Sequence, residues 1–176
     1  MKNIILIGFM GTGKTSTGRL LASRLGYSFI DTDHTIEVDH KITIKAMFAK
    51  YGEAHFRRKE AETIQKVAKY RNVIISTGGG AVLNPANLQV LQESGLVISL
   101  TAEIDVILDR TGRKSSRPLL ALEDANQRRE MIVNLLENRK DLYQKADFSI
   151  DTSNLSPLQV VEQILLFLRK EAGTHV

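Results

Sequence analysis

One glycine-rich segment constrains this chain more than any other. Residues 8–15 read Gly-Phe-Met-Gly-Thr-Gly-Lys-Thr and match the phosphate-binding pattern Gly-x-x-x-x-Gly-Lys-Thr at every fixed position. A short apolar run of mostly β-branched residues, at 4–7, precedes the loop like a buried parallel strand, and leucines at helical spacing follow the loop up to Gly26. A strand, a glycine loop and a helix N-terminus in this order form a cradle for phosphate. We therefore expect the chain to bind a nucleoside triphosphate.

Two side chains of this loop have distinct expected roles. Lys14 would reach the β- and γ-phosphates, and the Thr15 hydroxyl would ligate Mg²⁺. The alternative, a glycine-rich turn with an accidental lysine, does not explain the flanking strand and helix. The predicted nucleotide-binding residues of the loop are Gly11, Thr12, Gly13, Lys14, Thr15 and Ser16.

The rest of the chain repeats the alternation of strand and helix. Short apolar runs at 27–30, 72–76, 96–100 and 148–150 are separated by helical patterns. Five such strands predict an α/β fold in which a parallel sheet has helices on both faces, in one domain over residues 1–176. Residues 125–145 are expected to form one long helix, and the polar, basic residues 111–120 to be unstructured.

Composition excludes several classes of protein. Without cysteine there is no disulfide, thiol nucleophile or cysteine-ligated metal site. The net charge of +4 suits a small anionic substrate, and no basic stripe with stacking aromatics indicates nucleic acid. No apolar run approaches the ~20 residues that span a bilayer, so we expect no membrane partner and a cytoplasmic protein.

Two aspartates follow the second predicted strand. Asp31 and Asp33 are two residues apart, so in extended backbone both carboxylates would face one side. Ligands of open α/β sheets bind at the carboxyl ends of the strands, so the pair should face the phosphate loop. One carboxylate could hold Mg²⁺ through water, while the other orients a substrate hydroxyl or takes its proton. The alternative is that the pair only caps the next helix.

The third predicted strand ends unlike that of many phosphate-loop ATPases. Ser76-Thr77 stand where those proteins carry a Mg²⁺-binding aspartate, and the base-reading motif of GTPases and the motifs of protein kinases are absent. These absences favour a kinase of a small molecule. Residues 78–80 are three glycines, which either let a ligand approach the backbone closely or form a flexible turn.

The arginines fit more than one interpretation. Arg57 lies on a helical pattern near Glu60, where a solvated surface and a bidentate carboxylate site are equally consistent with the spacing. Arg117 lies in a basic segment that could close over the transferring phosphoryl group as a lid, or be an ordinary surface loop. For Arg139, spacing alone predicts a solvated position.

Six segments together resemble the shikimate kinase family. They occur in the family's order, and no motif position departs from its pattern: the phosphate loop, Asp-Thr-Asp at 31–33, Phe-Arg-Arg-Lys-Glu at 56–60, Ser-Thr-Gly-Gly-Gly-Ala-Val at 76–82, Arg-Pro-Leu-Leu at 117–120 and Arg-x-x-x-Tyr at 139–143. The loop is common to many families, whereas the combination is specific. The resemblance implies a nucleoside-monophosphate-kinase-like fold with a five-stranded parallel sheet, a substrate-binding helical region over about 33–62 and a lid over about 111–122.

The resemblance also implies roles that spacing leaves open. Arg57 and Arg139 would grip the carboxylate of shikimate, and Glu60 would hold Arg57. The full set of positions that match the family's shikimate-binding residues is Asp33, Arg57, Gly79, Gly80 and Arg139.

Further matches concern ATP and the metal. Thr15 matches the Mg²⁺ ligand, and Asp31 matches the carboxylate that holds the metal through water. Arg117 matches the lid arginine near the phosphates, and Arg110 resembles the residue that flanks adenine.

The implied reaction transfers the γ-phosphoryl group of ATP, with Mg²⁺, to the 3-hydroxyl of shikimate in aromatic amino acid biosynthesis. Lys14, Asp33 and Arg117 are the expected catalytic residues, and we expect a monomer. The nearest alternative is a gluconate-type sugar-acid kinase on the same fold. A nucleotide-binding module without catalysis is a further alternative, but it predicts the loss of Lys14, Asp33 or a substrate arginine, and all are present.

Overall fold

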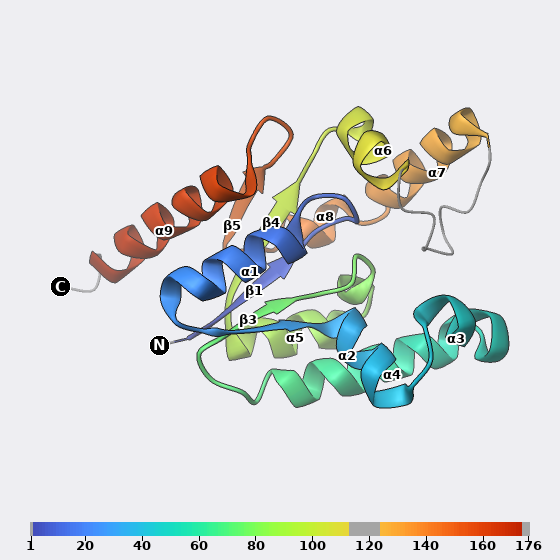
Figure 1. The fold of residues 1–176 in the computed structure, drawn as a ribbon, viewed down its shortest axis with the longest axis horizontal. Helices are drawn as coiled ribbons and strands as arrows, with labels where there is room; N and C mark the ends of the chain where they lie inside the picture. The colour runs from blue at the N-terminus through green and yellow to red at the C-terminus, as the bar shows by residue number, and fades with distance from the viewer. Residues whose placement is uncertain (1, 113–123, 174–176) are drawn as a thin grey trace.

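A five-stranded, all-parallel sheet forms the centre of the computed structural model, which describes residues 2–112 and 124–173 (Figure 1). The strand order is β2-β3-β1-β4-β5. This confirms the α/β fold and the parallel sheet expected from the alternating pattern. The strands are β1 (Asn3–Ile7), β2 (Ser28–Asp31), β3 (Val73–Ser76), β4 (Gly95–Thr101) and β5 (Phe148–Asp151).

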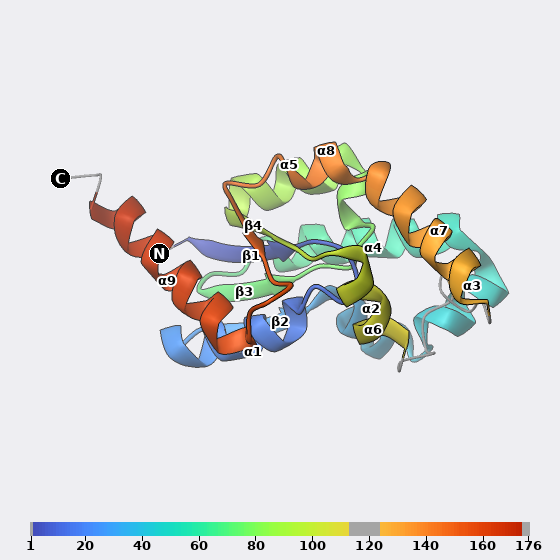
Figure 2. The same cartoon turned by 90° about the horizontal axis from the view of Figure 1, so that it is seen from above.

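Helices cover both faces of the sheet, with α1 and α9 on one face and α5 and α8 on the other (Figure 2). Among the described residues, no helix is long and apolar enough to cross a membrane. The helices are α1 (Lys14–Leu25), α2 (Thr32–His40), α3 (Ile44–Tyr51), α4 (Glu53–Val67), the 3₁₀ turn η1 (Ala81–Leu83), α5 (Pro85–Ser94), α6 (Ile104–Gly112), α7 (Ala125–Glu137), α8 (Lys140–Tyr143) and α9 (Pro157–Gly173).

Strand β1 shows why its sequence is apolar throughout. Successive side chains of a strand point to opposite faces, so a strand covered on both faces needs apolar residues at every position. Ile4 and Leu6 belong to the core under α1 and α9, whereas Ile5 and Ile7 belong to the core under α4 and α5. All four are at most 3% exposed.

The strand order places the functional loops together. From β1 the chain crosses to β2 at one edge and returns to β3 beside β1, and it then continues to β4 on the other side. The direction of winding therefore changes at β1, and ligands of such sheets bind at the carboxyl ends beside this point.

Gly8 begins the loop at this point with φ +139°, and a Cβ on it would lie 2.1 Å from the carbonyl oxygen of Leu100, so glycine is required.

The second strand does not continue in extended backbone to Asp33, as the placement of the two aspartates had required. It ends at Asp31, and α2 already begins at Thr32, so Asp33 lies in a helix and not in extended backbone. The cause is local, because Asp31 Oδ1 accepts the N–H groups of Asp33 and His34 at 3.1 and 3.2 Å and thereby caps α2. Capping is therefore one real role of Asp31.

The long helix predicted over 125–145 is also wrong, since it consists of two helices. α7 ends at Glu137, and α8 begins at Lys140 after Arg139, whose φ is −115°. No glycine or proline marks this interruption in the sequence.

The segment 111–120 was expected to be unstructured. Thr111 and Gly112 are instead helical and complete α6. The remainder of the predicted lid, with Arg117, lies outside the described residues.

Candidate active site

A cavity of about 370 Å³ lies over the phosphate loop. Lys14, only 8% exposed, donates from Nζ to the carbonyl oxygens of Gly8 and Phe9, both at 2.8 Å. Gly11 and Gly13 have φ values of +81° and +91°, a region that favours glycine. The loop therefore has an anion-cradle conformation with its lysine held on the loop itself.

Arg110 and Thr152 brace the loop from outside. Arg110 donates to the carbonyl oxygens of Gly11, at 3.2 Å, and Thr152, at 2.8 Å. The buried Thr152 hydroxyl donates to the carbonyl oxygen of Thr12 at 3.0 Å. The sequence interpretation missed Thr152. Its place just after the last predicted strand, where ligands of parallel sheets bind, was the available signal.

Thr15 and Asp31 both lie on the wall of this cavity and carry side-chain oxygens. The Thr15 hydroxyl donates to Asp31 Oδ2 at 3.0 Å. No cluster of three or more histidine, cysteine, aspartate or glutamate side chains able to hold a metal occurs in residues 2–112 and 124–173. Mg²⁺ needs none, because it keeps several waters and binds one or two protein oxygens together with substrate phosphates. The donor set present fits that mode of binding.

A second cavity, of about 820 Å³, opens beside the first. Asp33, in the first turn of α2, lines both. A group bound on the phosphate loop can therefore meet one bound in the second cavity next to this carboxylate. The residues shared by the two walls are Thr15, Asp31, Asp33, Gly78 and Gly79.

An ion pair on α4 forms one side of the second cavity. Arg57 donates from Nη1 to Glu60 Oε2 at 2.8 Å and from Nη2 to Glu53 at 3.2 Å. Glu60 is 1% exposed, and this burial raises the pKa of its carboxyl group against the opposing charge of Arg57. Arg57 therefore does not belong to a solvated surface, which resolves the ambiguity that spacing left open.

Two of the three glycines after β3, Gly78 and Gly80, permit a close approach, and Gly79 is in ordinary contact with the phosphate loop. A Cβ on Gly78 would lie 2.6 Å from Asp33 Oδ1, and a Cβ on Gly80 would lie 2.6 Å from Arg57 Nη2. A Cβ on Gly79 would approach the backbone nitrogen of Met10 to 3.4 Å. Close packing against site residues, and not flexibility, accounts for this run.

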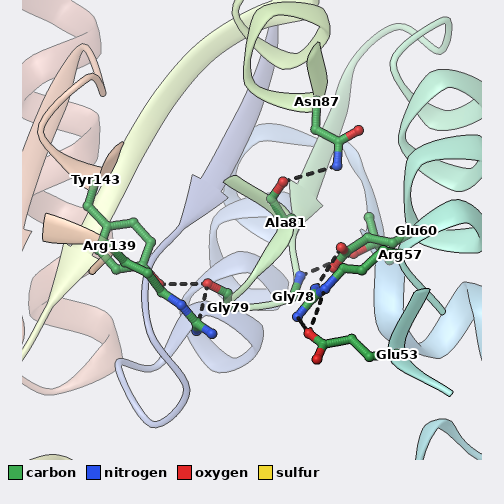
Figure 3. Close-up of polar contacts among 10 residues, drawn as sticks. Glu53, Arg57, Glu60, Gly78, Gly79, Ala81, Asn87, Arg139 and Tyr143 are labelled. Atoms are coloured by element: carbon green, nitrogen blue, oxygen red, sulfur yellow. Dashed lines mark hydrogen bonds and ion pairs between the residues drawn. The ribbon is translucent and has the colours of Figure 1, made fainter. Parts of the chain in front are cut away.

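Arg139 and Tyr143 approach Gly79 from the side opposite Arg57 (Figure 3). Arg139 Nη1 and the Tyr143 hydroxyl both donate to the Gly79 carbonyl oxygen, at 3.2 and 2.7 Å. Arg139 is 3% exposed and stacks over the Phe9 ring at 5.5 Å. Its Nε is buried and has no acceptor among the residues that the structure describes. The solvated position predicted from spacing is therefore wrong.

Most of the predicted site residues line one or both cavities. Thr12 is the exception among those described, because it is buried and its hydroxyl donates to the Phe9 carbonyl oxygen within the loop. Arg117 cannot be placed, since it lies outside the described residues. The predicted residues that line a cavity are Gly11, Gly13, Lys14, Thr15, Ser16, Asp31, Asp33, Arg57, Gly79, Gly80, Arg110 and Arg139.

Comparisons with known proteins agree with the resemblance in the motifs. The family model described as shikimate kinase matches residues 10–169. A shikimate kinase of Pelotomaculum thermopropionicum is 48% identical over 97% of both chains. The solved structure of the shikimate kinase of Acinetobacter baumannii in complex with shikimate superposes with a TM-score of 0.93 at 34% identity, covering 97% of this chain and 94% of that one.

A gluconokinase bears on the alternative substrate. The structure of the enzyme from Sinorhizobium meliloti has a TM-score of 0.62 at 17% identity and covers 98% of this chain and 94% of that one. Likeness at this level shows a shared fold alone, so the gluconate-type alternative has less support.

Proposed function

Because the chain belongs to the shikimate kinase family, we propose that its residues catalyse transfer of the ATP γ-phosphoryl group to the 3-hydroxyl of shikimate. The chain is a phosphotransferase that acts on an alcohol group, and its products are shikimate 3-phosphate and ADP. The relative from Acinetobacter baumannii binds shikimate, which supports the same ligand here.

The observation that carries the mechanism is the shared wall of the two cavities. The phosphate loop lines one cavity, Arg57 and Arg139 line the other, and Asp33 lines both. Phosphoryl transfer depends mainly on positioning and charge stabilisation, with the attacking and leaving oxygens roughly in line. We assign Asp33 to the attacking hydroxyl, which it orients and whose proton it accepts.

We assign binding of the carboxylate of shikimate, the phosphoryl acceptor, to Arg57 and Arg139. Arg57 reaches the cavity from α4 and Arg139 from the opposite side, next to Gly79 and Gly80. A buried guanidinium requires charge partners, and the buried Nε of Arg139 lacks an acceptor among the described residues. A carboxylate between the arginines would provide that acceptor, and the N–H groups of Gly79 and Gly80 would add donors.

The phosphate side is assigned to the loop. The N–H groups of residues 11–16 would bind the phosphates, and Lys14 would move from the loop carbonyls to the β- and γ-phosphates. Arg110 would flank adenine while bracing the loop. The role of Arg117, closing over the transferring group, rests on the family resemblance alone.

Thr15 and Asp31 would hold Mg²⁺, Thr15 directly and Asp31 through water. The metal would neutralise negative charge on the phosphates when bound. We also propose a monomeric enzyme with one kinase domain, whose single sheet carries both cavities.

A substrate panel tests the function. Purified protein is mixed with ATP and Mg²⁺ and with shikimate, gluconate or no acceptor, and release of ADP is followed. We expect release that depends on shikimate and on Mg²⁺. Turnover with gluconate but not shikimate would support the alternative, and nucleotide binding without any turnover would indicate a non-catalytic module.

A further inference from the structure

Tyr143 lies beside the second cavity, which we assigned to the phosphoryl acceptor and call the acceptor cavity, but it does not line that cavity. Its ring is buried in the core under α4 and α5, and its hydroxyl donates to the Gly79 carbonyl oxygen at 2.7 Å. This is the shorter of the two side-chain hydrogen bonds to that oxygen, since Arg139 donates at 3.2 Å. None of the roles assigned above uses this residue.

The position of Tyr143 depends on the interruption between α7 and α8. Arg139 is the residue before α8, and Tyr143 is the last residue of α8. The backbone N–H of Tyr143 still bonds to the carbonyl oxygen of Arg139 at 3.0 Å. A change of chain direction before this single turn thus brings both side chains to one carbonyl group, that of Gly79 (Figure 3).

Holding this carbonyl also orients the next N–H group. No cis peptide bond occurs in the described chain, and in a trans peptide the carbonyl and the following N–H point in opposite directions. With the Gly79 oxygen directed at Tyr143, the Gly80 N–H is directed away from it. Arg57 lies close to Gly80, since its Nη2 would be 2.6 Å from a Cβ on that residue.

Neither Gly79 nor Gly80 has a Cβ to restrict its backbone, so this peptide needs an external hold. We propose that Tyr143 is a positioning residue for the acceptor: by fixing the Gly79–Gly80 peptide it aims the Gly80 N–H at the bound acid and keeps Arg139 beside it. The Tyr143 hydroxyl donates to the Gly79 carbonyl oxygen both before and after the acid binds. Burial raises the pKa of Tyr143 to about 12, so the hydroxyl keeps its proton at any pH at which the enzyme is assayed.

This inference rests on the proposed function, because it assigns the cavity to an acidic alcohol. The decisive variant is Tyr143→Phe, which removes the hydroxyl and keeps the ring. We expect the KM for shikimate, and its Kd by calorimetry, to rise roughly three- to tenfold, the size of one hydrogen bond. The KM for ATP and the pH profile of kcat/KM should stay the same, since Tyr143 lines neither cavity and the Gly80 residue that it orients lines the second cavity alone.

Two control variants separate positioning from stability. Ile164→Val removes a methylene group from the core on the other face of the sheet and lowers stability without touching the site. Tyr70→Phe makes the same chemical change at a tyrosine that is 42% exposed. Both should keep the wild-type KM for shikimate.

The possible outcomes distinguish the two proposals. An unchanged KM for shikimate in Tyr143→Phe overturns the positioning role, as does an equal rise in the KM of both substrates. The positioning role is also overturned if Ile164→Val, at the same loss of melting temperature, raises the KM for shikimate by the same factor as Tyr143→Phe. If the wild-type protein neither binds nor phosphorylates shikimate, the proposed function itself fails.

Discussion

Single residues of the site are constrained mainly by close contacts. Asp33 Oδ1 would lie 2.6 Å from a Cβ on Gly78, so a side chain at position 78 would displace the carboxylate from its observed place on the wall of both cavities. The sequence alone indicated that Lys14 and Asp33 lie at one site, and both line the first cavity, while their roles stay predictions. It did not predict that Arg139 is buried, because spacing along a helix does not show which surface another loop covers.

Replacing Asp33 by asparagine should separate chemistry from nucleotide binding. Asparagine keeps the shape of the side chain but cannot take the hydroxyl proton, so we expect kcat to fall about 10²- to 10⁴-fold. Calorimetry should show ATP binding close to that of the wild type, because the phosphate loop is intact. Near-normal turnover would remove Asp33 from the mechanism.

Replacing Gly80 by alanine should weaken the acceptor site alone. The new Cβ would meet Arg57 Nη2 at 2.6 Å and displace the guanidinium, while the φ of −100° causes no backbone strain. We expect shikimate binding to weaken by about 1.5–3 kcal/mol, the range for hydrogen bonds to charged groups. Gly173→Ala is the control, because its Cβ would meet nothing within 4 Å. Equal effects of the two variants would contradict the argument.

Glu60 predicts a dependence of stability on pH. Burial, the largest cause, raises its pKa above 4.5 in the folded protein, so the native state binds the proton more tightly than the unfolded state. Its contribution to the free energy of unfolding must then decrease as the pH rises above about 4.5. Urea unfolding of the wild type and Glu60→Gln from pH 4 to 8 measures this. Their difference in unfolding free energy should decrease with pH, and an increase would show that Arg57 dominates over burial.

Helices and strands were predicted well where local signals mark their ends. Helix α5 begins at Pro85 after the cap Asn84, and α1 ends at Leu25 with Gly26 as its C-cap, as the sequence indicated. The interruption before α8 has no such signal, and it coincides with contacts from Arg139 and Tyr143 to Gly79, which is 60 residues distant in sequence from Arg139. Element boundaries set by tertiary contacts cannot be read from local patterns.

The start of α9 offers a test at this scale. The Ser156 hydroxyl accepts the Gln159 N–H at 3.3 Å, and Gln159 Oε1 accepts the Ser156 N–H at 2.8 Å, which forms a capping box. Ser156→Ala should cost about 1 kcal/mol, or about 2–4 °C in melting temperature, with kcat unchanged. Ser23→Ala in α1 should cause no such loss, because alanine is the better helix former. Equal stability of the two variants would exclude the capping role.

The molecule as a whole joins two binding sites through one sheet. The phosphate loop follows β1, the glycine run follows β3, and the order β2-β3-β1-β4-β5 makes these strands neighbours. Each ligand should therefore stabilise the fold through its own set of loops. The two cavities share a wall but differ in the rest of their lining, so the stabilisation that each ligand causes can be measured separately in the same protein.

Thermal shifts should separate the two sites. Each ligand at about 100 times its Kd should add about 2.7 kcal/mol, or about 5–10 °C, to the wild-type protein. Arg57→Ala should lose about 2–5 kcal/mol of shikimate binding, the range for truncating a buried charge pair, and with it most of the shikimate shift. The shift with ATP and Mg²⁺ should persist. Loss of both shifts would mean that Arg57 supports the whole fold, and retention of both would exclude it from the acceptor site.

The sequence by itself determined the phosphate loop, the five strands and the α/β class. These features depend on local backbone geometry and on the spacing of apolar residues within each segment. Both can be read from residues that are neighbours in the sequence. Only the tertiary structure decided that Arg139 is buried, that Tyr143 and Arg139 share the Gly79 carbonyl, and that Thr152 braces the loop. Those contacts join residues 60 to 140 positions apart, and their energy depends on distances that exist only once the sheet has brought its loops together.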